Sequence, residues 1–333
     1  MEIRLVCGHR YFLIDETVLN FSIHDFILSK DRTLLHRSFF YPAFYERVGT
    51  NAFPMLEKYP YFISTNDSSY FLNQTNILNE DRLSEKKLEA LQYFMLCLWF
   101  IKDNSANTEY LYTYIPQRKM ALSRIRNILY SNASGEYLET LFNISDLESA
   151  KNIFHRLQTL SQTELKKNEI TGLPKHIEDH YKIDEGDFNS IIYNSQNRID
   201  RAILFLQLAR SKSYLPINIT FYIAIYEALF TTSDGEISHK VTERATLYLA
   251  GSIAEKLNNF KIIKTGYDIR SKFVHGQKLN KKHKSKEDLI PISKELDELT
   301  RVLLNKIILS DSDVFLLDDE KLEEWFKELI LKS

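Results

Sequence analysis

An arginine and a histidine stand five positions apart in the segment YDIRSKFVHG, residues 267–276. On a helix, a five-residue offset turns about 140° around the axis, so Arg270 and His275 do not project from one stripe. The long Arg side chain narrows that gap, and Gly276 favours a left-handed helix end that leaves His275 in the last turn. Both groups could then face a common anion. The helix dipole alone also favours basic residues in a last turn, so a structural role is the alternative.

Further polar residues surround this motif. Ser271 stands four residues before His275 and could hydrogen-bond it, while Asp268 and Lys272 have the spacing of an ordinary surface pair. The next segment, QKLNKKHKSK, holds five lysines within 278–286. Such a run is usually a solvated loop, and its position beside the motif makes phosphate contact a second use. Salt would weaken such contacts, which we assign to Lys272, Lys278, Lys281 and Lys282.

Helices must position these residues, because the sequence after residue 187 has helical patterns almost throughout. Short polar turns such as TSDGE join the segments, which indicates an up-and-down bundle. The periodicity predicts five helices: 188–212, 216–231, 236–257, a fourth that holds the Arg270 motif, and 288–309. The last residues, KLEEWFKELILKS, form an acidic amphipathic helix that we expect to pack on its own core through Leu322, Trp325, Phe326 and Leu329.

The first half of the chain has a different pattern. Residues 3–14 and 59–74 alternate large apolar side chains with turn-forming residues, as short antiparallel strands do. Ser84 is a candidate N-cap for a helix over 85–103, after which a strand is expected, and a second capped helix begins near Ser145. We therefore predict a mainly α protein, α+β overall, with a smaller β-rich N-terminal region.

Composition limits the remaining possibilities. The 333 residues are 44% hydrophobic, as in globular proteins, and the segment 171–187 has the Gly, Pro and charge content of a connection. We predict an N-terminal region over 1–186 and a C-terminal domain over 187–333. From Asp187 to Lys286 there are 16 Lys and Arg against 8 Asp and Glu, although the whole chain carries −2. A positive block in a mildly acidic protein suggests a surface for an anion.

The cysteines, the first residues and the longest apolar run indicate the cellular location of the protein. Two cysteines ninety residues apart support no disulfide framework, and no secretory signal is apparent at the start. The longest apolar run, 91–101, is too short to cross a bilayer. We expect a cytoplasmic protein without a membrane partner.

The segment RSKFVHG and the helices before it resemble the HEPN superfamily in its Apea-like branch. The signature of that branch is an Arg, four to six residues and then a His, and here four residues, 271–274, intervene. The likeness covers about residues 190–280 and includes RAILFLQLAR, FYIAIYEALF and ERATLYLAG. The spacing is weakly specific, whereas the ordered set of helices is more so. The resemblance implies a HEPN-like helical bundle.

The resemblance further implies a metal-independent endoribonuclease that works as a homodimer, with the signatures of both chains meeting at the interface. RNA carries its own nucleophile, the 2′-hydroxyl, so cleavage needs a base for that proton and a cation for the charge on phosphorus. His275 suits the first task, and Arg270 suits the second because its planar fork binds two phosphate oxygens. A partner chain could supply a second His275 as the acid. The expected products are a 2′,3′-cyclic phosphate and a 5′-hydroxyl.

Two further charged residues interrupt apolar helical faces and are candidates for a supporting part. Glu227 stands in FYIAIYEALF and Arg244 in ERATLYLAG, where a lone buried charge would be costly. Either could contact the site, or the two could pair with each other as a structural bridge. We include Glu227, Arg244 and Ser271 as supporting residues beside the catalytic candidates Arg270 and His275.

The biological setting rests on the same resemblance. Bacterial proteins of this kind act as toxins or in antiphage defence by abortive infection, cutting cellular RNA when released from control. The N-terminal region would then bind an antitoxin or a trigger protein. A different class of function stays open, namely a non-catalytic HEPN module that binds RNA, nucleotide or a protein. A third is a scaffold whose N-terminal half does the main work.

Metal and cofactor chemistry has little support in the residues. His176 and His180 lie one turn apart, but zinc peptidases of that type need a Glu directly after the first His, and here Ile177 stands there. Cys7 and His9 offer two ligands without a second pair nearby. The chain has nine glycines and no Gly-rich phosphate loop. We expect no metal and no cofactor.

Overall fold

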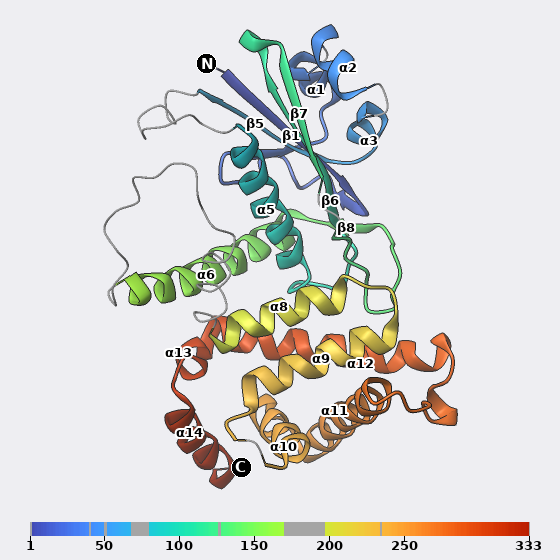
Figure 1. Cartoon of the computed structure of the whole chain (residues 1–333), viewed down its shortest axis with the longest axis vertical. Coiled ribbons are helices and arrows are strands. Elements are labelled where there is room, and N and C mark those ends of the chain that lie inside the picture. The colour runs from blue at the N-terminus through green and yellow to red at the C-terminus, as the bar shows by residue number, and fades with distance from the viewer. Residues whose placement is uncertain are drawn as a thin grey trace. The chain divides into compact units, whose positions relative to one another are not determined.

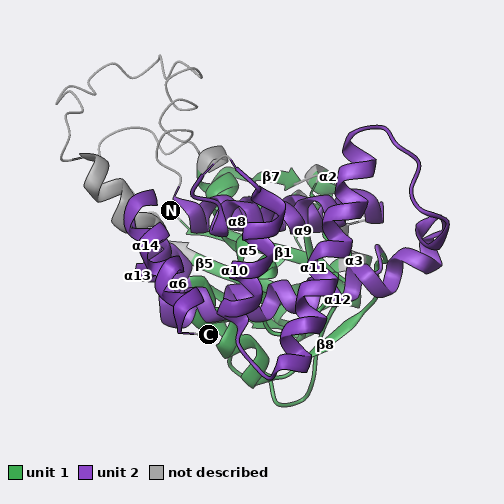
Figure 2. Ribbon diagram, turned by 90° about the horizontal axis from the view of Figure 1, so that it is seen from below, with its two compact units in different colours: residues 1–132, 136–154 green, residues 133–135, 155–333 purple. Residues whose placement is uncertain are grey.

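The computed structural model describes residues 2–39, 41–49, 52–67, 80–125, 128–169, 197–233 and 235–332. The chain forms two compact units, one of residues 1–132 and 136–154 and the other of residues 133–135 and 155–333 (Figure 2). The division falls within one long helix, α6 (Ile144–Glu169). The boundary expected at 186–187 lies outside the described residues and stays a prediction.

The N-terminal unit is built on an antiparallel six-stranded sheet (Figure 1). β1 lies between β5 and β6, and in this register Val6 is opposite Ile63 on one side and Tyr112 on the other. A parallel pair, β2 (Phe12–Ile14) with β8 (Thr140–Phe142), forms a second small sheet. The strands of the large sheet, in spatial order, are β3 (Ser22–Ile23), β4 (Phe26–Ser29), β5 (Tyr61–Asp67), β1 (Glu2–Arg10), β6 (Asn107–Ile115) and β7 (Met120–Ile125).

Helices cover both faces of this sheet. Side chains of one face, such as Val6 and Tyr112, pack against three short helices, α1 (Arg32–Phe39), α2 (Pro42–Val48) and α3 (Ala52–Lys58). On the other face the ring of Phe62 meets that of Phe94 from α5 (Glu80–Leu98), with centroids 6.0 Å apart. Because both faces are covered, β1 is buried almost throughout instead of alternating.

Of the two capped helices expected in this half, the structure displaces the start of one and confirms that of the other. α5 begins at Glu80, so Ser84 lies inside the helix, where its hydroxyl is 2.7 Å from the Thr113 hydroxyl on β6. The cap of α6 is Asn143, whose side chain accepts a hydrogen bond of 2.8 Å from the Asp146 amide. Ser84 is therefore not a cap, whereas α6 is capped and begins at Ile144, near Ser145 as expected. The strand expected after α5 is confirmed as β6.

The second unit is helical, and α9 runs through its centre (Figure 1). Residues on every side of α9 are buried, as is typical of a helix that is apolar all round, and Glu227 is its one charged residue. α9 packs against four neighbours. The helices are α8 (Arg198–Arg210), α9 (Leu215–Phe230), α10 (Ile237–Leu249), α11 (Ile253–Val274), α12 (Lys286–Lys306), α13 (Ser312–Phe315) and α14 (Asp319–Leu331).

The helix predicted over 236–257 is in fact two helices. Ala250 and Gly251 both have positive φ, 59° and 101°, which ends α10. Ser252 then caps α11 in a capping box with Glu255, each side chain accepting from the backbone N–H of the other residue. Helical periodicity continues across this junction, so only the Gly-Ser pair marks the break.

The C-terminal helix packs on the core of its own unit, as expected. Leu322 and Phe326 are buried, and the Phe326 ring lies 5.6 Å from that of Phe230 on α9. The fold is mainly α, with a smaller antiparallel β-rich part at the N-terminus, which confirms the predicted class. Among the described residues, no helix has the length and apolar character needed to span a bilayer.

Candidate active site on α9 and α11

An ion pair joins the central helix to the helix that holds the motif. Arg270 on α11 donates through Nη2 to Glu227 Oε2 on α9, at 3.1 Å. The two side chains are half-buried, at 34% and 23% exposure, so the pair is partly shielded from water and still reachable. The sequence marked both residues as candidates but did not predict that they pair with each other.

This ion pair lies in a cleft of about 600 Å³. Three helices line it: α9 at its C-terminal end, α10 through its first two residues, and α11 along one face. The remaining polar lining is mostly hydroxyl-bearing, so the cleft offers hydrogen-bond donors and acceptors around one guanidinium. The lining residues are Glu227, Thr231, Ile237, Ser238, Tyr267, Asp268, Arg270 and Ser271.

Burial dominates the electrostatics of the cleft. It raises the pKa of Glu227, while the positive charge of Arg270 and the nearby Tyr267 hydroxyl act in the opposite direction. Burial also raises the pKa of Tyr267, and the neighbouring Glu227 carboxylate adds to that increase. Tyr267 is 6% exposed, and its hydroxyl and the Glu227 carboxylate are close neighbours although no well-formed hydrogen bond joins them.

His275 lies outside this cleft. It is the exposed C-cap of α11, and Gly276 follows with φ +68°, which confirms the expected left-handed helix end. The Gln277 amide donates to the Lys272 carbonyl at 2.8 Å, and the Gly276 amide donates to that of Phe273 at 3.2 Å. These two bonds form a Schellman motif, so the backbone that carries His275 is well defined.

The structure therefore brings together only part of the expected set. Arg270, Glu227 and Ser271 share the cleft, whereas His275 does not line it. The Ser271–His275 contact is made by the backbone, because the His275 amide donates to the Ser271 carbonyl at 3.1 Å. Within one chain, the described residues do not bring His275 and Arg270 into one cleft.

Three of the lysines expected to contact phosphate lie beyond the end of α11, and Lys272 lies in its last turn. Lys272 donates to the Asn280 side chain, so it does not form the surface pair with Asp268 considered above. Lys278, Lys281 and Lys282 are exposed, the last two in a short 3₁₀ helix, Lys281–His283. Lys282 also lines a second cavity, of about 440 Å³, which shares Asp268 with the first.

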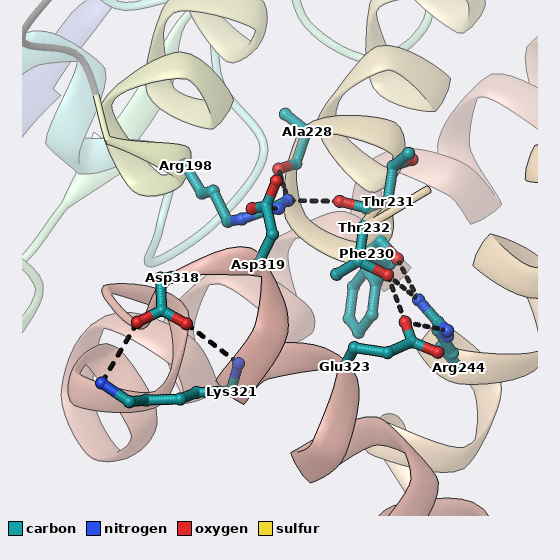
Figure 3. A network of polar contacts seen from close by, with 10 residues as sticks. All are labelled: Arg198, Ala228, Phe230, Thr231, Thr232, Arg244, Asp318, Asp319, Lys321 and Glu323. Carbon is teal, nitrogen blue, oxygen red and sulfur yellow. Dashed lines mark hydrogen bonds and ion pairs between the residues drawn. The ribbon is translucent and has the colours of Figure 1, made fainter. Parts of the chain in front are cut away.

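Arg244 has a different environment from Arg270 (Figure 3). It is 4% exposed and donates to the Phe230 carbonyl at 3.0 Å, to Thr232 Oγ1 at 2.9 Å and to Glu323 Oε2 at 2.6 Å. It does not line the cleft. The idea that Arg244 and Glu227 pair with each other is therefore wrong, because each has its own partner.

A second buried arginine completes that network. Arg198 donates to the Ala228 and Thr231 carbonyls at 3.0 and 2.6 Å and pairs with Asp319 of α14 (Figure 3). Two guanidinium groups thus cap the C-terminal end of α9, where the helix dipole favours positive charge, and two carboxylates of α14 neutralise them. Sequence reasoning missed Arg198.

The sequence analysis also missed Tyr267, although its spacing from Arg270 could have identified it. It stands three residues before Arg270, so both project from the same face of α11. Thr231 and Ser238, by contrast, reach the cleft from two other helices, and no local pattern connects them to the motif.

The candidate metal ligands Cys7 and His9 have apolar surroundings. Cys7 and His9 are buried in the core of the N-terminal unit, and burial lowers the pKa of His9 to about 3. His176 and His180 lie outside the described residues. Within the part of the chain that the structure describes, no group of three or more His, Cys, Asp and Glu side chains could hold a metal ion.

The cleft can thus hold one phosphate at Arg270, beside the half-buried carboxylate of Glu227. The His275 imidazole and the exposed lysines lie outside the cleft, at and after the end of α11. Comparison with known proteins adds no relative: no protein-family model, no curated protein and no solved structure matches this chain.

Proposed function

We propose that this chain is a metal-independent endoribonuclease of the HEPN type, which cleaves RNA by 2′-hydroxyl attack. The observation that carries the proposal is the half-buried Arg270 guanidinium in a polar cleft, one and a half turns before an exposed His275. Guanidinium groups bind phosphate in two-point geometry, and imidazole transfers protons near neutral pH. The exposed lysines after the helix end add charge for the flanking RNA backbone.

A second copy of the chain completes the proposed site. Because His275 does not line the cleft of its own chain, the proton transfer assigned to it requires a partner whose helix end approaches that cleft. We therefore include a homodimer in the proposal. In such a dimer each active site would combine Arg270 of one copy with His275 of the other.

The wider setting is proposed on the same resemblance. The enzyme would act in the cytoplasm as a toxin or antiphage-defence effector, and the region over 1–186 would bind the antitoxin or trigger protein. Cellular RNA is the proposed substrate, and no cofactor is required for the chemistry.

The decisive test is cleavage of total RNA in EDTA by the purified protein. We expect the parent to produce fragments with 2′,3′-cyclic phosphate and 5′-hydroxyl ends, and Arg270→Ala and His275→Ala to produce none. Arg201→Ala and His239→Ala are matched controls, because both residues are exposed and neither lines the cleft. Intact RNA with the parent, or equal cleavage by all variants, would overturn the proposal.

One observation favours the non-catalytic alternative. Arg270 is already paired with Glu227, and His275 stands apart from that pair, as they would in a module that only binds RNA, nucleotide or a protein. The same experiment separates the two, because a binding module retains RNA in a filter or gel-shift assay without cutting it.

A further inference from the structure

We propose that Glu227 is the general base that takes the proton from the attacking 2′-hydroxyl. This inference rests on the proposed ribonuclease function and changes one part of it: His275 is left to protonate the leaving 5′-oxygen. The central helix α9 then carries a catalytic residue, and not merely the counterion of Arg270.

Position selects Glu227 among the groups of the cleft. A base must lie within hydrogen-bond reach of the proton that it removes. Of the two carboxylates that line the cleft, Asp268 is exposed, whereas Glu227 is half-buried and joined to Arg270. The hydroxyl groups of the lining are neutral, and because burial raises the pKa of Tyr267, its phenol stays protonated and cannot accept the proton.

The contact with Arg270 places the base where the reaction occurs. In the proposed complex Arg270 holds the phosphate that is attacked, and the 2′-hydroxyl belongs to the ribose attached to that phosphate. A carboxylate oxygen 3.1 Å from Nη2 of the same guanidinium is therefore close to the attacking oxygen. Holding base and nucleophile in this way lowers the entropic part of the barrier.

The surroundings also suit proton abstraction. Arg270 and Tyr267 of α11 act on Glu227, and Asp268 of the same helix also lines the cleft. The α10 residues of the cleft, Ile237 and Ser238, do not titrate. Burial raises the pKa of Glu227 more than Arg270 lowers it, which makes the ionised carboxylate a stronger base than an exposed Glu.

The proton balance is complete without any added reagent. The 2′-O–H bond breaks and its proton goes to Glu227, while the 2′-oxygen forms its bond to phosphorus. The P–O5′ bond breaks, and the leaving oxygen takes a proton from the His275 imidazolium of the second copy. Proton exchange with water then returns Glu227 to the carboxylate and His275 to the imidazolium.

The test compares cleavage of a short RNA by the parent, Glu227→Gln and Glu227→Ala across pH. The base must be ionised, so the parent's kcat/KM rises with pH through the Glu227 pKa, and Glu227→Gln loses this acidic limb together with about 10²–10⁴-fold in rate. Added formate should restore part of the rate to Glu227→Ala. Glu243→Gln, a half-buried carboxylate on α10 outside the cleft, is the matched control.

Binding separates a base from a structural counterion. With a 2′-deoxy analogue that cannot be cleaved, Glu227→Gln should bind as tightly as the parent or more tightly, because Arg270 loses a competing carboxylate. An unchanged acidic limb in Glu227→Gln, or no rescue of Glu227→Ala by formate, overturns the base assignment while RNA cleavage by the parent still stands. A parent that cuts no RNA overturns the proposed function itself, which is a separate result.

Discussion

Glu323→Gln tests whether the buried Arg244 network holds the C-terminal helix in place. The exchange keeps the size and hydrogen-bonding shape of the side chain but removes its charge. Glu323 is the carboxylate partner of Arg244, at 2.6 Å, and also accepts a hydrogen bond from the Thr232 hydroxyl (Figure 3). The variant therefore leaves a guanidinium that is 4% exposed without its negative partner.

The expected cost follows from the exposure of the two partners. Removing one partner of a fully buried ion pair costs about 3–5 kcal/mol, whereas exposed pairs contribute about 0–1 kcal/mol. The Arg244 side chain is 5% exposed, but that of Glu323 is 31% exposed, so water screens the pair in part. We expect a cost of roughly 1–2 kcal/mol, which increases local opening of α14 by about tenfold.

Hydrogen exchange of the α14 amides, resolved by peptide mass, measures this opening directly. At neutral pH the amides of α14 should exchange about tenfold faster in Glu323→Gln than in the parent. Glu324→Gln is the matched control, since Glu324 is an exposed carboxylate on the same helix. Adding Arg244→Met should produce less than the sum of the two separate effects, because the residues act as a pair.

The destabilisation caused by Glu323→Gln must also decrease as the pH falls. The hydrogen bond from Thr232, and then Arg244, lowers the pKa of Glu323 in the folded protein. A carboxyl group with a lowered folded pKa contributes stability above its unfolded pKa of about 4.3, and this is lost as pH falls through the folded value. The difference between parent and variant should therefore disappear at acidic pH. Equal exchange at neutral pH, or a difference that grows in acid, would refute this account of α14.

Two more expectations concern stability alone. Gly276→Ala should lower the free energy of unfolding by about 1 kcal/mol in urea titrations, because Gly276 has φ +68° and an added Cβ meets no atom within 4 Å, which leaves only backbone strain. Gly235→Ala, also in open space but without a positive φ, should be close to neutral. His9→Leu should flatten the loss of stability in acid: burial lowers the pKa of His9 to about 3, so in the parent the unfolded chain binds the extra proton and stability falls as pH drops from about 6.5 toward 3. A parent and His9→Leu with the same slope over that range would contradict the neutral, buried state of His9.

Helices and strands were predictable from the sequence where the spacing of apolar residues follows one pattern through the segment. β1, β5 and α5 were predictable because each segment carries the apolar side chains that it buries, although the burial of β1 does not alternate. Helix ends were less predictable, because they depend on partners outside the segment. Ser84 has the composition of a cap, yet Thr113 of a neighbouring strand takes its hydroxyl and the helix continues through it.

The site was predictable residue by residue but not as an arrangement. Arg270 and Glu227 stand 43 positions apart; Arg270 was selected for its spacing to His275, and Glu227 because a charge on an apolar helical face needs a partner. Arg244 satisfies the same criterion, so the sequence alone could not say which carboxylate goes with which guanidinium. The choice is made by packing: α11 presents Arg270 to Glu227 in the last turn of α9, whereas α10 presents Arg244 to the Phe230 carbonyl at the end of that helix.

Because their partners differ, removal of Arg244 and removal of Arg270 should affect different properties of the protein. Arg244 is buried and donates hydrogen bonds to a backbone carbonyl, a hydroxyl and a carboxylate. Its removal should therefore lower the stability of the fold. Among the described residues Arg270 pairs with Glu227, and its side chain lines the cleft and is 34% exposed, so a ligand can compete for it without unfolding the helix. Of Glu227, Arg244 and Arg270, only Glu227 and Arg270 pair with each other inside a cleft of the described residues.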